Sequence, residues 1–69
     1  MVEVFKTNIQ RKRTAAKIKM ELLSRFPDCK INFDLDDCDR ILRIESARGI
    51  GKTIEQAVSE KGFYCEELQ

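Results

Sequence analysis

The chain has 69 residues, of which 42% are hydrophobic and 36% charged, and its formal net charge is +1. This composition is too apolar and too periodic for a disordered chain, and the apolar runs are too short to span a membrane. The sequence contains no histidine and no signal-peptide layout, so we expect one soluble, cytoplasmic, non-catalytic domain over residues 1–69.

The first third of the sequence predicts a strand followed by a helix. Residues 2–7 alternate in polarity and contain the strand formers Val and Phe. Residues 11–26 have apolar side chains at steps of three or four, which predicts an amphipathic helix that Pro27 ends. Asn8 or Thr14 is expected to cap this helix. Its apolar stripe consists of Ala15, Ile18, Leu22 and Phe26, widened by Ala16, Met20 and Leu23.

The middle of the sequence predicts a β-hairpin followed by a second helix. Apolar and polar residues alternate over residues 30–35 and again over residues 40–46, as in half-buried strands. The polar segment 36–39 joins them as a tight turn. Residues 47–51 are expected to form a linker, and residues 52–61 have the apolar spacing of a helix.

The last stretch completes the element order. Gly62 stands where a left-handed helix cap belongs, and residues 63–65 start a last short strand. Two β-α-β units with right-handed crossovers predict a ferredoxin-like βαββαβ fold of the α+β class. We expect a four-stranded antiparallel sheet of order 4-1-3-2 with both helices on one face. The predicted core comprises Val4, Ile18, Leu22, Phe26, Ile31 or Phe33, Leu42, Ile44, Ile54, Val58 and Phe63.

Three stretches carry a family resemblance. Residues 22–27 (LLSRFP), 31–36 (INFDLD) and 54–63 (IEQAVSEKGF) occur in an order and spacing similar to the heavy-metal-associated domain family. That family comprises small ferredoxin-like copper chaperones and the metal-binding domains of metal-transporting ATPases. The three stretches resemble, in turn, the end of its first helix, its second strand, and its second helix running into a glycine and an aromatic residue.

The metal-binding motif of that family has no counterpart here. The family places two cysteines, spaced C-x-x-C, between the first strand and the first turn of the first helix, where soft thiolates hold Cu(I). The matching residues 7–14 (TNIQRKRT) contain no cysteine, methionine or histidine, and their three adjacent cations would repel a metal ion. We therefore predict no metal ligand and no cofactor.

The cysteines leave a second hypothesis open. Cys29, Cys38 and Cys65 are odd in number and none forms a C-x-x-C pair, so we expect reduced thiols. In the predicted strand order, Cys29 and Cys65 lie at opposite sheet edges, too far apart to pair, and Cys38 is the most exposed. The alternative function is a copper-type metal chaperone or transport-related metal-binding domain that uses non-standard ligands among these three residues.

Motifs of other protein classes are incomplete. Residues 49–53 (GIGKT) end like a phosphate-binding loop but lack its first glycine, and we interpret them as a linker and helix start. Residues 34–39 lack the glycine of a calcium loop and are interpreted as an acidic turn. Residues 4–9 resemble one ribonucleoprotein motif, but residues 40–45 contain no aromatic residue, which disfavours RNA or polyanion binding as a further alternative.

The most unusual feature is a basic run on the first helix. Residues 11–19 contain five cations and no acid, an arrangement that opposes the helix dipole. The preferred hypothesis is a protein-interaction or regulatory module that uses this end, and the alternative is an ordinary solvated helix face. The partner is expected to be an acidic protein, and the chain a monomer or weak dimer without membrane contact. The candidate surface consists of Asn8, Gln10, Arg11, Lys12, Arg13 and Lys17.

Overall fold

The computed structural model describes residues 1–36 and 38–68, which form strands and helices in the predicted order. The elements are β1 (Val2–Thr7), α1 (Lys12–Arg25), β2 (Lys30–Asp34), β3 (Ile41–Glu45), α2 (Gly51–Ser59) and β4 (Cys65–Leu68). The turn predicted over residues 36–39 includes Asp37, which lies outside the described residues. Within the described ranges, neither helix is long and apolar enough to cross a membrane.

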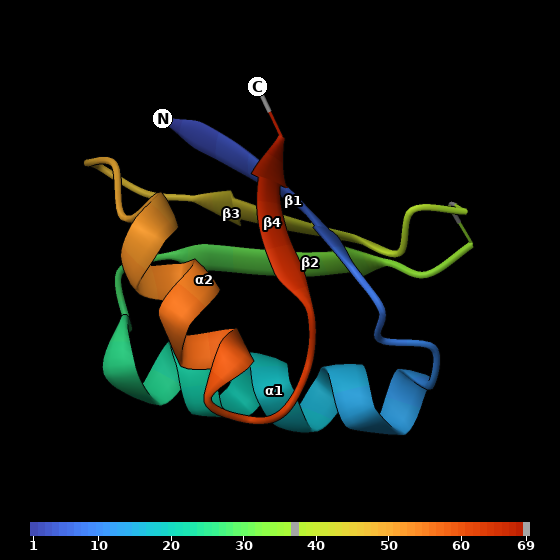
Figure 1. The fold of residues 1–69 in the computed structure, drawn as a ribbon. Helices are drawn as coiled ribbons and strands as arrows, with labels where there is room; N and C mark the ends of the chain where they lie inside the picture. The colour runs from blue at the N-terminus through green and yellow to red at the C-terminus, as the bar shows by residue number, and fades with distance from the viewer. Residues whose placement is uncertain (37, 69) are drawn as a thin grey trace.

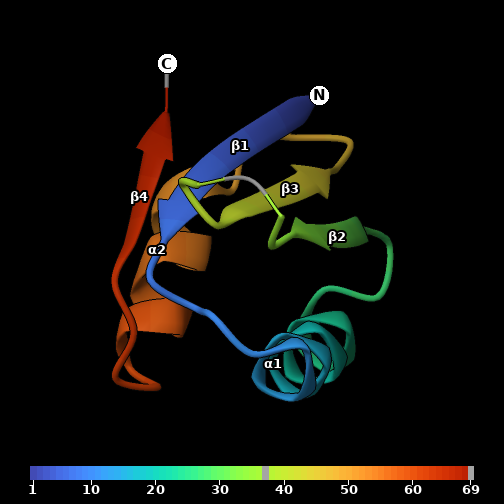
Figure 2. The same ribbon diagram turned by 90° about the vertical axis from the view of Figure 1, so that its right-hand side faces the viewer.

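The four strands form one antiparallel sheet in the order β2-β3-β1-β4. This is the predicted order 4-1-3-2 counted from the other edge. Both helices lie on the same face of the sheet, and the opposite face is left uncovered (Figures 1 and 2). The predicted ferredoxin-like α+β architecture is therefore confirmed.

The second half of the chain differs in detail from the expected boundaries. α2 begins at Gly51, inside the stretch expected to be a linker, and ends at Ser59. Gly62 has a φ of 91°, the left-handed conformation that the sequence predicted for this glycine. The chain then needs Phe63 and Tyr64 to return to the sheet, so β4 starts at Cys65 instead of at residue 63.

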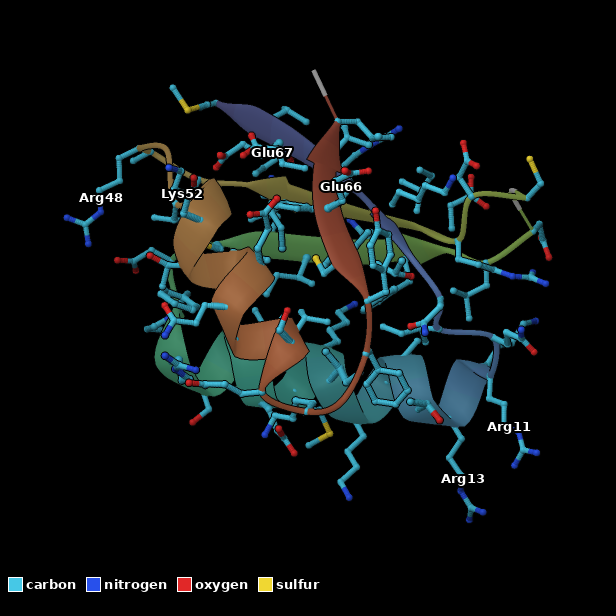
Figure 3. All side chains as sticks on the ribbon, viewed as in Figure 1. Arg11, Arg13, Arg48, Lys52, Glu66 and Glu67 are labelled. Carbon is cyan, nitrogen blue, oxygen red and sulfur yellow. The ribbon has the colours of Figure 1, made fainter. Side chains whose placement is uncertain are left out.

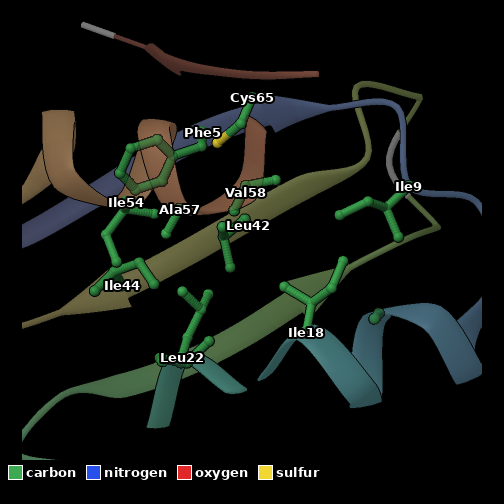
Figure 4. Packing of buried hydrophobic residues seen from close by; sticks show 12 residues of the cluster. Phe5, Ile9, Ile18, Leu22, Leu42, Ile44, Ile54, Ala57, Val58 and Cys65 are labelled. Carbon is green, nitrogen blue, oxygen red and sulfur yellow. The ribbon is translucent and has the colours of Figure 1, made fainter. Parts of the chain in front are cut away.

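The hydrophobic core fills the space between the sheet and the two helices (Figure 4). The predicted core residues that the structure buries are Ile18, Leu22, Ile31, Leu42, Ile44, Ile54 and Val58. Phe26, Phe33 and Phe63 pack against this cluster but are only partly buried. Phe26 and Phe63 therefore line the rim of the core, because each one sits just outside a helix or strand.

The orientation of β1 is the main correction to the predicted core. Val4 is only half-buried, whereas Phe5 is 0% exposed and pairs in register with the buried Leu42. Because neighbouring residues of a strand point to opposite faces, Val4 lies on the open face and Phe5 under the helices. The prediction that Val4 belongs to the core was wrong.

Two polar residues share the buried face of β1 with Phe5, and both have hydrogen-bond partners. The hydroxyl of Thr7 donates to the carbonyl of Arg40 at 2.6 Å and accepts from the N–H of Ile9 at 3.2 Å. A Glu3 carboxylate oxygen accepts from the N–H of Ile50 at 2.9 Å. Since buried polar groups are tolerated when they are hydrogen-bonded, this face of β1 can be both polar and buried.

α1 also departs from its predicted details. Its N-cap residue is Arg11, and no side chain caps the helix, so the expectation for Asn8 or Thr14 was wrong. Met20, expected to widen the apolar stripe, is 72% exposed. The helix buries only a narrow stripe, because β2 and α2 pack against one side of it.

Candidate functional site

The candidate surface lies on the first half of α1 and the loop that leads into it. Its cations, Arg11, Lys12, Arg13, Lys17 and Lys19, make up the basic side of α1. Arg11 ends the loop after β1 in an extended conformation, and Lys12 and Arg13 follow in the first helical turn. That turn contains no acidic residue, so positive side chains meet the positive end of the helix dipole. Arg11 and Arg13 extend away from the ribbon into solvent (Figure 3).

Within residues 1–36 and 38–68, the cations of α1 and its N-cap form no ion pair. The ion pairs in the described part of the chain are Lys6 with Asp39, at 3.8 Å, and Lys61 with Glu21. Neither involves the five cations of the run, which are Arg11, Lys12, Arg13, Lys17 and Lys19. All except the half-buried Lys19 are exposed. These charges are therefore available to groups outside the molecule.

The helical spacing divides the basic run between two grooves. Lys12 and Lys19 line a groove of about 280 Å³ between α1 and the end of β2. Arg13 and Lys17 line a groove of about 640 Å³ between α1 and residues 61–63. The candidate surface predicted from the sequence contains Lys12 together with Arg13 and Lys17, and the structure places Lys12 on one flank of α1 and the other two on the opposite flank.

The groove beside residues 61–63 contains residues that the sequence prediction missed. Lys61 and Phe63 form the wall opposite α1, and Ile18 lies at the base of the groove. Lys61 and Phe63 are remote from the basic run in sequence, so only the packing of α1 beside the end of α2 brings them next to it. The signal available in the sequence was the predicted fold itself, which places both helices on one face.

Asn8 makes a hydrogen bond within the chain, whereas Gln10 is exposed as expected of a surface residue. The side-chain oxygen of Asn8 accepts a hydrogen bond from the N–H of Tyr64 at 2.9 Å, which ties the loop after β1 to the start of β4. Gln10 is exposed in the same loop. Asn8 therefore holds two loops together at the basic end of the domain.

An acidic cluster lies at the start of α2, away from the basic end (Figure 3). The Glu67 N–H donates to a carboxylate oxygen of Glu55 at 2.6 Å. A Cβ added to Gly51 would collide with carboxylate oxygens of Glu67 and Glu3, so these two carboxyl groups pack directly on the helix start. Burial, and then a hydrogen bond to Glu3, raise the pKa of the Glu67 carboxyl. The carboxyl groups of this cluster therefore already contact other groups of the same chain.

The three cysteines lie in separate places. Cys29 precedes β2 and Cys65 begins β4, and these strands are the two opposite edges of the sheet. Cys65 is buried, and burial raises the pKa of its thiol to about 12, whereas Cys38 is exposed. Among residues 1–36 and 38–68, no three histidine, cysteine or carboxylate side chains are grouped to hold a metal ion.

The open face of the sheet lacks the stacking residues of RNA-binding domains. Phe5, the aromatic residue of the ribonucleoprotein-like stretch, is fully buried under the helices. The central strands place Val2, Val4 and Lys6, and Ile41, Arg43 and Glu45, on the open face. No aromatic residue belongs to that set, so bases have no stacking platform on the central strands.

Comparison with known proteins adds no further guide. The chain matches no protein-family model, no curated protein and no solved structure. The resemblance to heavy-metal-associated domains therefore stays a prediction, and the function has to be argued from the side chains of this chain.

Proposed function

We propose that the protein is a non-catalytic binding module that recognises an acidic protein partner through the basic side of α1. The observation that carries the proposal is the set of five cations on α1 and its N-cap, none of which has an ion-pair partner in the described part of the chain. The first helical turn contains neither an acidic residue nor a side-chain cap.

This arrangement disfavours the folded chain slightly when it is alone. Each cation near a helix N-terminus costs a few tenths of a kcal/mol, because it faces the positive end of the dipole. An acidic group from a partner would be attracted by the cations and by the helix dipole together. Local misfits of this kind are more frequent at functional sites than elsewhere.

The charge distribution favours a protein partner over a long polyanion. The net charge is only +1, and the acidic residues Glu66 and Glu67 lie at the far side of the domain (Figure 3). Attraction between exposed charges is screened beyond about 10 Å at moderate salt, so the basic side of α1 acts over a short range. A compact acidic surface fits this range.

The test is a binding titration with a glutamate-rich peptide, followed by fluorescence anisotropy. An Arg11→Gln/Arg13→Gln variant should bind the peptide several-fold more weakly than the parent. The matched control is Arg43→Gln/Arg48→Gln, which removes two exposed cations elsewhere and should bind like the parent. Equal weakening by the control variant would refute the proposal.

Two further measurements address the alternatives from the sequence. Native mass spectrometry of the reduced protein with Cu(I) and Zn(II) should show no stoichiometric complex, and a stable complex would make the metal chaperone the first choice. A salt series with single-stranded RNA should show weaker binding than the acidic peptide at every salt concentration. Tighter RNA binding would favour the polyanion alternative.

A further inference from the structure

The groove between α1 and residues 61–63 has an excess of positive charge. Arg13 and Lys17 line it from α1, and Lys61 lines it from the other side. The acid on its wall is Glu21, which forms an ion pair with Lys61. Arg13 and Lys17 therefore set the sign of the groove, because the charges of Glu21 and Lys61 offset each other.

The same groove offers an apolar surface. Phe63 is half-buried, so part of its ring faces the groove, and Ile18, which is 3% exposed, lies beneath it. The ion pair between Glu21 and Lys61 connects α1 to the turn after α2 and holds the two walls together. A ligand that places an apolar side chain on Phe63 would remove apolar surface from water.

The neighbouring groove between α1 and β2 lacks this charge excess. Its two lysines, Lys12 and Lys19, share the lining with the two carboxylates of Asp34 and Asp36. An acidic ligand placed there would meet as many like charges as opposite ones. Charge complementarity therefore distinguishes the two grooves and selects the one beside residues 61–63.

We infer that the groove lined by Arg13, Lys17 and Phe63 binds an acidic-apolar segment of the partner protein. This inference rests on the proposed function and adds the location and the chemistry of the ligand. Arg13 and Lys17 are one helical turn apart, about 6 Å along the axis. Two carboxylates at that separation belong to residues four apart in a helix or two apart in a strand. An apolar side chain between them would pack on Phe63.

The experiment uses a peptide of alternating glutamate and leucine and two control peptides, one with glutamine for glutamate and one with serine for leucine. Binding to the full chain is followed by fluorescence anisotropy. The Arg13→Gln/Lys17→Gln variant should bind the glutamate-leucine peptide about tenfold more weakly. The matched variant Lys12→Gln/Lys19→Gln removes the same charge from the other flank of the same helix and should weaken binding by only about twofold, because these lysines attract the ligand from a longer distance.

The apolar part of the inference has its own variant. Phe63→Leu retains an apolar side chain, and an amide NMR spectrum like that of the parent will show that the fold is kept. It should weaken binding of the glutamate-leucine peptide, and it should leave the weaker binding of the glutamate-serine peptide unchanged. This pattern identifies direct contact between the leucine side chains and Phe63.

The other outcomes separate the inference from the proposed function. Equal weakening by the two double variants, or no effect of Phe63→Leu, would overturn the groove assignment and leave the basic side of α1 as an acid-binding surface. No binding of any glutamate-containing peptide, or tighter binding of single-stranded RNA than of the peptides, would overturn the proposed function and the groove assignment with it.

Discussion

The replacement of Phe5 by Ala tests the orientation of β1, on which the whole core arrangement depends. Phe5 is fully buried, so the substitution removes most of an aromatic side chain and leaves a cavity, at a cost of about 3–5 kcal/mol. The free energy of unfolding of a protein domain is about 0.05–0.15 kcal/mol per residue, so this cost is a large part of the total stability. Val4→Ala removes two half-buried methyl groups and should cost about 1 kcal/mol or less.

Urea unfolding followed by circular dichroism measures both costs. If Phe5→Ala leaves too little folded protein, Phe5→Leu should still show a loss of about 1 kcal/mol, because it changes shape and volume without emptying the site. A larger loss for Val4→Ala than for either Phe5 variant would mean that β1 presents its other face to the helices, and the described packing would be refuted.

Three further changes have defined outcomes. The pKa of the Glu67 carboxyl is raised in the folded chain. Protonation of this carboxyl therefore stabilises the folded state at acid pH, and this stabilisation is lost as the pH rises through the folded pKa. In thermal melts, Glu67→Gln should therefore stabilise the protein more at neutral pH than at acid pH, and an unchanged difference would contradict the shift. Arg11→Cys/Thr14→Cys restores a C-x-x-C spacing at a helix N-terminus and should gain modest Cu(I) binding in native mass spectrometry; a variant without a Cu(I) complex would count against the placement of this loop. A thiol reagent should modify Cys38 well before Cys65, whose thiol is buried with a pKa of about 12, and the reverse order by peptide mass spectrometry would refute that burial.

The architecture could be predicted because several local signals agree with one another. The change from helical to strand periodicity around Pro27, the alternating hairpin strands and Gly62 each limit the topology. Right-handed crossovers then leave few arrangements, and the structure has the expected one. Most of the predicted core follows directly, since residues such as Leu22 and Ile44 lie on faces that only one packing can bury.

The orientation of β1 could not be predicted from residue types alone. Val2 and Val4 form the more apolar face by count, whereas the buried face combines Phe5 with the polar Glu3 and Thr7. That face is buried because distant backbone groups satisfy its polar atoms. These partners are the N–H of Ile50, just before α2, and the carbonyl of Arg40, just before β3, and only the folded chain brings them to β1.

The candidate site could likewise be predicted only in part from the sequence. The basic run is evident in the sequence, because five cations within residues 11–19 need no structural knowledge. The division of those cations between two grooves depends on what packs on each side of α1. Lys61 and Phe63 on one side, and Asp34 and Asp36 on the other, are contributed by segments far away in the chain.

If the basic side of α1 is the binding surface of this protein, an acidic ligand should perturb that region of the chain. The most direct measurement is an amide NMR titration of the isotope-labelled chain with the glutamate-leucine peptide, at low and at high salt. Binding at this surface should shift amide signals in the first half of α1 and at residues 61–63, and these shifts should fade as salt screens the charges. Shifts confined to the open face of the sheet or to the acidic end at Glu66 and Glu67 would contradict it.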